Sequence, residues 1–185
     1  TKLLSKNVAT IMLTVEDTKN LDPSVKDKSV VTGLPVRKAF KRISKSDARR
    51  RLGFADNEIV ILSAGGSLGS RVLNENIARL LKWYQVNGVK VNHIHSYGTY
   101  KGYSDYIEKL EADGVKVKNN PRLIVRDYID MPLCMAASDL VITRCGASTL
   151  TELESVGRGA ILIPSPMVAE NHQYYNGMVL QKAGA

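Results

Sequence analysis

The chain has few cysteines and no long apolar run. Cys134 and Cys145 are its only cysteines, too few for a disulfide framework, so a reducing cytosol is the simpler environment. No apolar stretch approaches the roughly 20 residues that span a bilayer. The first residues lack the apolar core and small-residue cleavage site of a signal peptide. With 44% hydrophobic and 24% charged residues, the composition is typical of a soluble globular protein.

Several motifs for metals and cofactors are also missing. No Cys/His spacing suits zinc, which disfavours a zinc enzyme. The glycine-rich segment 63–69 is not followed by the Lys-Ser/Thr pair of a Walker A loop. It does not read G-x-G-x-x-G either, so a dehydrogenase is disfavoured. We therefore expect no bound metal and no cofactor.

Negative charge is scarce in one segment of a chain whose net charge is +8. Residues 37–51 contain eight Lys or Arg and a single acid, Asp47. This pattern fits a solvated helix face, or a surface attracted to an anionic membrane or a polyanionic ligand. Nucleic acid is not expected, because aromatic residues are not interleaved with the basic ones and no known motif accompanies them.

The first 33 residues differ from the rest of the chain. Strands are predicted over residues 8–15 and 29–32, with a polar segment between them. Gly33-Leu34-Pro35 then marks a boundary, since Gly and Pro interrupt regular structure. We expect a segment 1–33 and a domain 34–185. The chain starts without Met and stops inside a helical pattern, which indicates a fragment of a longer protein.

Beyond residue 58, short apolar runs alternate with amphipathic segments. This alternation at βαβ spacing predicts an α/β domain with a parallel sheet and flanking helices. The predicted strands are 59–62, 89–94, 123–125, 139–143 and 160–163, and the predicted helices are 73–84, 105–112, 131–137, 149–156 and 172–182.

Two strand ends and a glycine-rich turn point to a ligand site. The carboxyl ends of parallel strands share one edge, where ligands bind in open α/β sheets. The strand ending near Arg144 leads through small residues into a helix whose N-terminal N–H groups favour an anion. The turn 63–69 offers further N–H groups and the Ser67 hydroxyl, although a tight turn without a ligand is the alternative.

Three polar positions have competing interpretations. Thr149-x-x-Glu152 matches a capping box, or the Glu152 carboxylate accepts hydrogen bonds from a ribose diol. His172 and Gln173 are surface or capping residues, or part of a polar cluster that binds sugar hydroxyls. His93 and His95 alternate along a predicted strand and are expected to be structural, and Cys145 is a small turn residue rather than a nucleophile.

Taken together, these segments resemble the MurG family, which transfers N-acetylglucosamine from UDP-GlcNAc onto lipid I, the undecaprenyl-pyrophosphoryl-MurNAc-pentapeptide, to give lipid II in peptidoglycan synthesis. The similarity runs in the family's order from residue 33 to the C-terminus. The matching stretches are Gly33-x-Pro35-Val36-Arg37, Gly65-Gly66-Ser67-x-Gly69, Tyr128-Ile129-x-Met131, Ala137-x-Asp139-Leu140-Val141-Ile142-x-Arg144, Gly146-Ala147-Ser148-Thr149-Leu150-x-Glu152-Leu153, and Ile163-Pro164 through Asn171-His172-Gln173-x-x-Asn176.

The resemblance implies a GT-B glycosyltransferase, in which two Rossmann-like domains face a cleft. Residues 34–185 would form the C-terminal domain that binds the UDP-sugar, without its final helical segment. Residues 1–33 would end the N-terminal domain, which binds lipid I and carries the catalytic base, so no catalytic residue is expected in this chain. A hexosyltransferase of this family would be peripheral on the cytoplasmic face of the bacterial membrane, on the anionic inner leaflet. The sequence has no D-x-D motif, which disfavours a metal-dependent glycosyltransferase.

The resemblance also implies a role for individual residues. Arg37 would lie at the interdomain cleft near the diphosphate, which Ser67 would contact. The backbone of Ile129 would hold the uracil edge. The remaining roles would be N–H donation to phosphate and sugar by Ala147, Ser148 and Thr149, ribose binding by Glu152, and recognition of the N-acetylglucosamine hydroxyls by Gln173 with His172 beside it.

Two other functions remain open at this point. The first is another GT-B enzyme acting on a UDP-sugar, such as a glycolipid glycosyltransferase or a UDP-GlcNAc epimerase. The second is a non-enzymatic basic α/β module on an acidic surface. Leu34 and Cys145 depart from the family's usual residues, Asn and Ala or Ser, and Leu34 puts any side-chain contact at that position in doubt.

Overall fold

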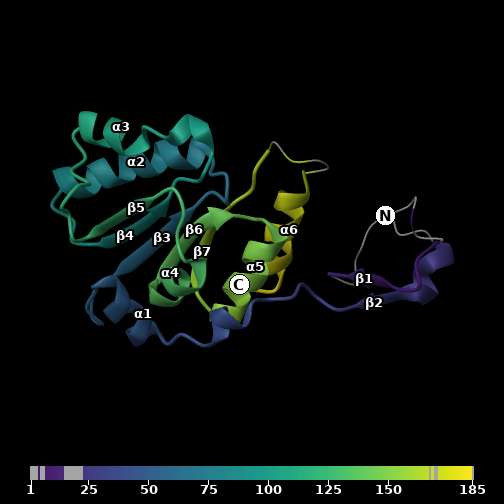
Figure 1. Cartoon of the computed structure of the whole chain (residues 1–185). Coiled ribbons are helices and arrows are strands. Elements are labelled where there is room, and N and C mark those ends of the chain that lie inside the picture. Colours follow the sequence, from purple (N-terminus) through teal and green to yellow (C-terminus); the bar gives the residue numbers. More distant parts are fainter. Residues whose placement is uncertain (1–3, 5–6, 15–22, 167, 169–170, 185) are drawn as a thin grey trace. The chain divides into compact units, whose positions relative to one another are not determined.

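A computed structural model describes residues 4, 7–14, 23–166, 168 and 171–184. The chain divides into two compact units, residues 1–36 and 37–185. In the first unit, β1 (Ile11–Leu13) pairs in parallel with β2 (Ser29–Val31), and the 3-10 helix η2 (Pro23–Lys28) precedes β2 (Figure 1). The predicted strand 8–15 is therefore shorter in the structure, and its last residue lies outside the described residues. That this unit belongs to an acceptor-binding domain stays a prediction.

The second unit is built on a five-stranded parallel sheet. Its strands are β3 (Val60–Ala64), β4 (Asn92–Ser96), β5 (Leu123–Arg126), β6 (Leu140–Arg144) and β7 (Gly159–Ile163). They lie in the order β5-β4-β3-β6-β7, and every pairing is parallel. This confirms the predicted α/β class with a parallel sheet. The chain runs outward on one side of β3 and then crosses to β6 on the other, as in doubly wound nucleotide-binding folds.

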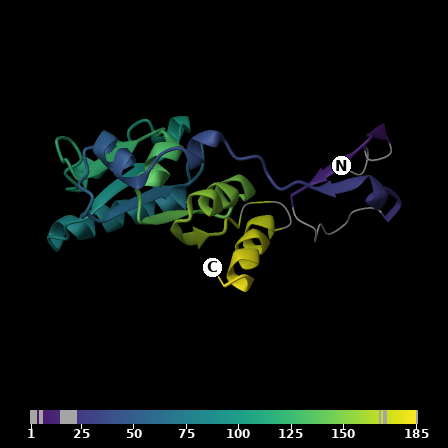
Figure 2. The ribbon, with the colours of Figure 1, turned by 90° about the horizontal axis from the view of Figure 1, so that it is seen from below.

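The helices of this unit contribute to two hydrophobic clusters. In one cluster, α2 (Arg71–Val86) and α3 (Tyr106–Ala112) pack with strand residues such as Val125 and Ile142. In the other, α1 (Lys45–Leu52) packs on α4 (Met131–Ala137) through Ala48, Ala136 and Ala137. Figures 1 and 2 show α5 (Ala147–Val156) beside α6 (His172–Lys182). The 3-10 helices η3 (Lys38–Lys41) and η4 (Lys101–Tyr103) complete the unit.

The predicted strand 89–94 is displaced in the structure. Gly88 adopts a φ of 64°, and the N–H of Val89 donates to the carbonyl of Tyr84 at 2.8 Å. These residues therefore close the last turn of α2, and the strand begins only at Asn92. Hydrophobic alternation could not separate a β-branched residue that ends a helix from one that starts a strand.

One member of the basic segment is not solvated. Arg49 is 2% exposed, and its Nε and Nη2 donate to the Ala137 carbonyl at 3.0 Å and to Asp139 Oδ2 at 2.7 Å. Asp139 also accepts from Lys45 and from the N–H of Val60. The solvated-face interpretation is therefore wrong for Arg49, which joins α1 to the amino-terminal ends of β3 and β6.

The two alternating histidines lie in the core, as a structural role requires. Oγ of Ser63 is 2.7 Å from Nε2 of His93 and 2.8 Å from Nδ1 of His95. Both imidazoles are fully buried, and burial lowers the pKa of His93 to about 3 and that of His95 to about 4. Both are therefore neutral near pH 7.

Among the described residues, no helix is both long and apolar enough to cross a membrane.

Candidate functional site

The candidate site lies at the carboxyl ends of β3 and β6, the two neighbouring strands at the middle of the sheet. The chain leaves β3 through a glycine-rich turn into α2, and it leaves β6 through Cys145 and Gly146 into α5. Connections on the two sides of this point run in opposite directions, which opens a crevice between them. The structure thus confirms the predicted edge and the two predicted strand-to-helix turns.

Close backbone packing explains the glycines of the first turn. Gly69 has a φ of 84°, and a Cβ there would lie 2.0 Å from the carbonyl oxygen of Tyr97. The N–H and hydroxyl of Thr99 donate to the carbonyl of Ser67 at 2.9 and 3.1 Å. The turn is therefore fixed on the loop that follows β4, and it holds the exposed side chain of Ser67 at the edge of the sheet.

The second turn presents unpaired N–H groups. Gly146 caps α5 with extended backbone, and the first bond of the helix runs from the N–H of Leu150 to the Gly146 carbonyl at 3.0 Å. The N–H groups of Ala147, Ser148 and Thr149 precede that bond, and none donates to a described residue. Three orphan donors at a helix N-terminus form a site suited to an anion.

The capping-box interpretation of Glu152 is wrong. Thr149 is the third helical residue rather than the cap, and the cap makes no side-chain hydrogen bond. The Glu152 carboxylate accepts no hydrogen bond from the described residues. Burial raises its pKa, and the positive charge of Arg37 opposes that shift. A half-buried acceptor without a partner, near a guanidinium, is available for a ligand.

A cavity of about 170 Å³ joins these groups. Four of the predicted site residues line it, namely Ser67, Ile129, Thr149 and Glu152. Ile129 is 8% exposed, and its backbone N–H and carbonyl bond to no described residue. The cavity therefore combines a hydroxyl, a carboxylate and a free peptide edge, all of which can bind a polar ligand. Among the described residues, no group of three or more His, Cys, Asp or Glu could hold a metal.

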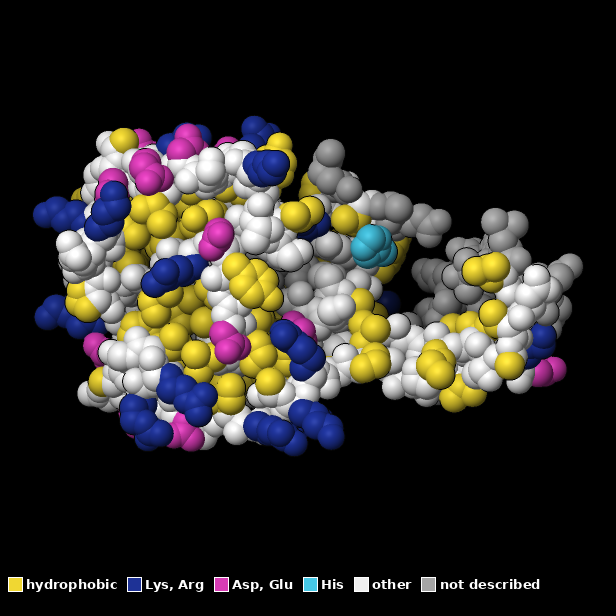
Figure 3. Space-filling model, in the orientation of Figure 1, with side chains coloured by type: hydrophobic (Ala, Val, Ile, Leu, Met, Phe, Trp, Pro, Cys, Tyr) yellow, Lys and Arg dark blue, Asp and Glu magenta, His cyan; other side chains and the backbone are white. Residues whose placement is uncertain are grey.

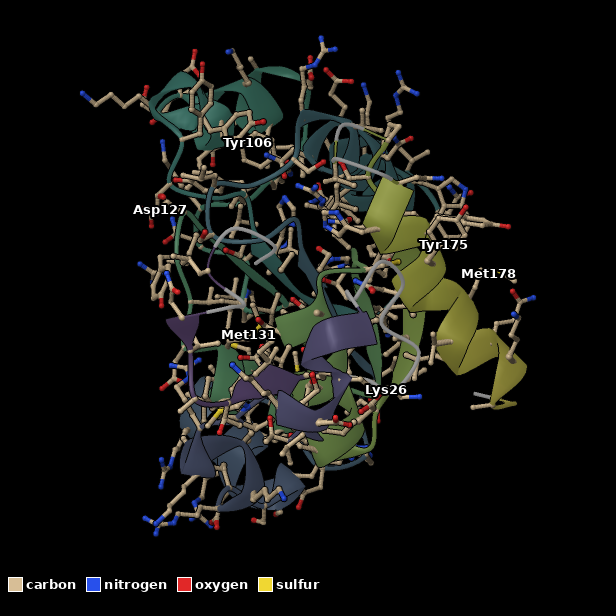
Figure 4. All side chains as sticks on the ribbon, turned by 90° about the vertical axis from the view of Figure 1, so that its right-hand side faces the viewer. Lys26, Tyr106, Asp127, Met131, Tyr175 and Met178 are labelled. Carbon is tan, nitrogen blue, oxygen red and sulfur yellow. The ribbon has the colours of Figure 1, made fainter. Side chains whose placement is uncertain are left out.

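Four lining residues were not predicted as site residues: Gly66, Ser96, Tyr128 and Met131. Tyr128 is 64% exposed, and its N–H donates to Asp127 Oδ1 at 2.7 Å. Asp127 and Met131, labelled in Figure 4, are the first residue after β5 and the first residue of α4. Tyr128 and Met131 belong to one of the motifs quoted above, but only the exposed aromatic ring in the structure marks Tyr128 as a candidate for ligand contact.

Gln173 and His172 lie apart from this cavity. Oε1 of Gln173 accepts from the N–H of Ser165 at 2.9 Å and from Nε of Arg144 at 3.4 Å. The oxygen is therefore already bonded. An amide in general can offer a sugar both an acceptor and a donor, but this one has only its N–H groups left. His172 is exposed at the start of α6, and Tyr175, one turn further along, is labelled in Figure 4.

A larger cavity, about 590 Å³, lies between α5, β7 and α6. Its walls are mainly apolar and include Leu153, Leu162, Met178 and Leu180. None of the predicted site residues lines it. A polar nucleotide needs bonded partners for its charges and hydroxyls, so the smaller cavity at the strand ends is the better candidate.

The strand order, the crevice and the orphan N–H groups together define an α/β domain of the Rossmann-like class. Residues 60–185 match the model of the glycosyltransferase family 28 C-terminal domain. The chain belongs to this glycosyltransferase family.

Curated relatives of this chain are named UDP-N-acetylglucosamine--N-acetylmuramyl-(pentapeptide) pyrophosphoryl-undecaprenol N-acetylglucosamine transferase. The one from Caldanaerobacter subterraneus is 35% identical over 184 residues, which cover 100% of this chain and 49% of that protein. The one from Clostridioides difficile is 37% identical over 186 residues and is covered to 44%. The chain thus spans about half the length of the curated relatives it matches.

Solved structures support the same fold. The crystal structure of Acinetobacter baumannii MurG matches with a TM-score of 0.58 and 28% identity, over 86% of this chain and 43% of that one. Anabaena HepE, solved in complex with UDP and glucose, matches with a TM-score of 0.51 and 15% identity, over 99% of this chain and 56% of that one. The second likeness concerns the fold alone. The predicted GT-B class and the predicted resemblance to the MurG family are confirmed.

Proposed function

We propose that this chain is the sugar-donor half of a transferase that moves N-acetylglucosamine from UDP-GlcNAc to lipid I, giving lipid II. The observation that carries the proposal is the cavity at the strand ends, which joins Ser67, Ile129, Thr149 and Glu152. The names and identities of the curated relatives support the choice of sugar and acceptor. Lipid I would bind mainly through the part of the enzyme that this chain does not include.

The diphosphate of the ligand would bind at the start of α5. The unpaired N–H groups of Ala147, Ser148 and Thr149 suit its oxygens. The hydroxyl of Ser67 and the guanidinium of Arg37 would add charge-assisted hydrogen bonds from the facing turn and from η3. Helix dipole and guanidinium would together stabilise the negative charge that develops on the leaving UDP, without a metal ion.

The nucleoside would occupy the cavity itself. The free peptide edge of Ile129 suits the alternating donors and acceptors of uracil. The exposed ring of Tyr128 offers a face for stacking on the base. The carboxylate of Glu152 would accept from both ribose hydroxyls. His172 and Gln173 would contact the sugar, with Gln173 using its Nε2 because its oxygen is already bonded.

The acceptor hydroxyl of lipid I would attack the anomeric carbon with inversion. We expect the general base for that step to come from the acceptor-binding half, so that this chain alone does not turn over. Its own contribution is to hold the sugar donor and to stabilise the leaving group.

We further propose that the enzyme works on the cytoplasmic face of the bacterial membrane. Lys and Arg side chains gather over η3 and α1 (Figure 3). Arg37, Lys38, Lys41 and Arg42 are exposed there, and such a surface is attracted to the anionic inner leaflet. Nucleic acid is not proposed as a partner.

Competition calorimetry tests the proposal. UDP-GlcNAc should bind to the chain in the presence of EDTA and should be preferred over UDP-glucose. Loss of binding on addition of EDTA would contradict metal-free binding. Preference for UDP-glucose would favour another enzyme of the same fold, and binding of anionic vesicles without any UDP-sugar would favour a non-enzymatic module.

A further inference from the structure

Two donors hold the side-chain amide of Gln173 where β6, β7 and α6 meet. Its Oε1 accepts from the N–H of Ser165 at 2.9 Å and from Nε of Arg144 at 3.4 Å. Gln173 is only 7% exposed, so water does not replace these partners easily. Because an amide oxygen only accepts and an amide nitrogen only donates, two donors on one side determine which end of the amide faces Arg144.

The fixed amide leaves only N–H groups for a ligand. Nε2 of Gln173 donates to none of the described residues. An amide free to rotate would present either end, whereas this one presents donors alone.

Arg144 connects this amide to the candidate site. It is the last residue of β6 and stands two positions before Gly146, the cap of α5. A second bond joins the same turn to α6, since Nδ2 of Asn176 donates to the carbonyl of Cys145 at 3.0 Å. These bonds therefore fix the position of the Gln173 side chain relative to the N-terminus of α5, where the diphosphate is proposed to bind.

We propose that Arg144 is a positioning residue for sugar recognition: it orients the Gln173 amide so that Nε2 donates to an acceptor oxygen on the sugar of the bound nucleotide. This inference rests on the proposed function, because it requires a UDP-sugar bound at the candidate site. It assigns one direction to the hydrogen bond, from protein to sugar. UDP has no sugar at that position and does not depend on the orientation.

The decisive variant is Gln173→Glu. A carboxylate keeps an acceptor for Arg144 and Ser165 but has no N–H group to give to the ligand. We expect affinity for UDP-GlcNAc to fall about tenfold, the value of one hydrogen bond, while affinity for UDP changes by less than about twofold. Calorimetry on the full chain measures both, and the ratio of the two affinities is insensitive to any loss of folded protein.

Arg144→Ala and Arg144→Lys test the positioning role. The alanine variant releases the amide, and we expect about a threefold to tenfold loss for UDP-GlcNAc with UDP unchanged. Lysine can still donate to Oε1, so it should restore part of the ratio. Asn176→Ala is the matched control: it removes the other bond between the turn and α6, and it should lower the melting temperature without changing the ratio.

Each remaining outcome has a definite meaning. An unchanged ratio in Gln173→Glu would overturn the donor assignment, because the side-chain oxygen alone would then account for the contribution of Gln173 to binding. Equal losses for UDP and UDP-GlcNAc in Arg144→Ala would overturn the positioning role. Failure of the unsubstituted chain to bind either ligand would refute the proposed function itself. This outcome is distinguishable from failure of the positioning role, because it is seen without any substitution.

Discussion

Nη2 of Arg49 lies 2.7 Å from Oδ2 of Asp139, although 90 positions separate the two residues in the chain. The Arg49 side chain is 3% exposed and that of Asp139 is 34% exposed. The pair joins α1 to the start of β6, and the same carboxylate accepts from the N–H of Val60 at the start of β3. A bond of this kind holds the sheet together at the edge opposite the candidate site.

Arg49→Met should therefore destabilise the chain. The substitution leaves Asp139 without its most buried partner, and breaking such pairs costs about 3–5 kcal/mol when both charges are buried. Because Asp139 keeps some contact with water, we expect about 2–3 kcal/mol in the free energy of unfolding by denaturant. Arg50→Met is the control: its pair with Asp47 is exposed, and its loss should cost less than about 1 kcal/mol. Equal costs would show that the Arg49 pair is not a structural clamp.

Much of the fold follows from the sequence, because the signals there are local. The alternation of apolar runs and helical periodicity predicts the parallel sheet, and the predicted helices 131–137 and 172–182 coincide with α4 and α6. The bond between Arg49 and Asp139 is not local, so the dense positive charge of residues 37–51 indicated a solvated face or a surface attracted to anions, and not a buried arginine. The start of β4 was misplaced because Val89, a β-branched residue, closes the last turn of α2 instead of starting the strand.

The site was predictable to a similar degree. Glycine-rich turns and strand ends identify the edge, and the resemblance identifies individual residues. Sequence spacing alone could not reject the capping box at Glu152, since that depends on where α5 begins. It also could not reveal that the Gln173 oxygen is bonded, because its partners Ser165 and Arg144 come from two other segments.

Glu152→Ala should weaken UDP binding without destabilising the fold. The carboxylate caps nothing and bonds to no described residue, so we expect the free energy of unfolding to change by less than about 0.5 kcal/mol. Loss of hydrogen bonds to the ribose should cost about 1–3 kcal/mol in UDP affinity. Glu154→Ala, an exposed position on the same helix, is the control for both measurements. A lower melting temperature with unchanged affinity would refute the ribose-binding role.

Gly69→Ala and Gly66→Ala should differ in cost. Both positions have positive φ, of 84° and 92°, which costs an alanine about 1–2 kcal/mol. At Gly69 a Cβ would also meet the Tyr97 carbonyl at 2.0 Å, whereas nothing lies within 4 Å at Gly66. We expect a clearly lower melting temperature for Gly69→Ala. Similar values would mean that the turn is not held against the loop after β4.

Stability should fall as the pH drops below about 6.5. Burial lowers the pKa of His93 to about 3 and that of His95 to about 4. The unfolded chain therefore binds more protons than the folded chain between those values and about 6.5, the usual pKa of His. Between pH 6 and pH 4.5 each imidazole should contribute a slope of up to about 1.4 kcal/mol per pH unit.

Denaturant titrations at several pH values measure this slope. His95→Gln should reduce it. An unchanged slope in His95→Gln would contradict the assignment of the pH dependence to the buried pair.

The most direct test of the central claim is a titration of UDP into the isotopically labelled chain, followed by backbone amide NMR. If the cavity at the strand ends binds the nucleotide, amide signals of Ser67, Ile129 and Ser148 should shift together with one dissociation constant. Signals of Leu162 and Leu180, which line the larger apolar cavity, should stay in place. Shifts confined to that apolar cavity, or no saturable shift at Ile129 and Ser148, would contradict the account.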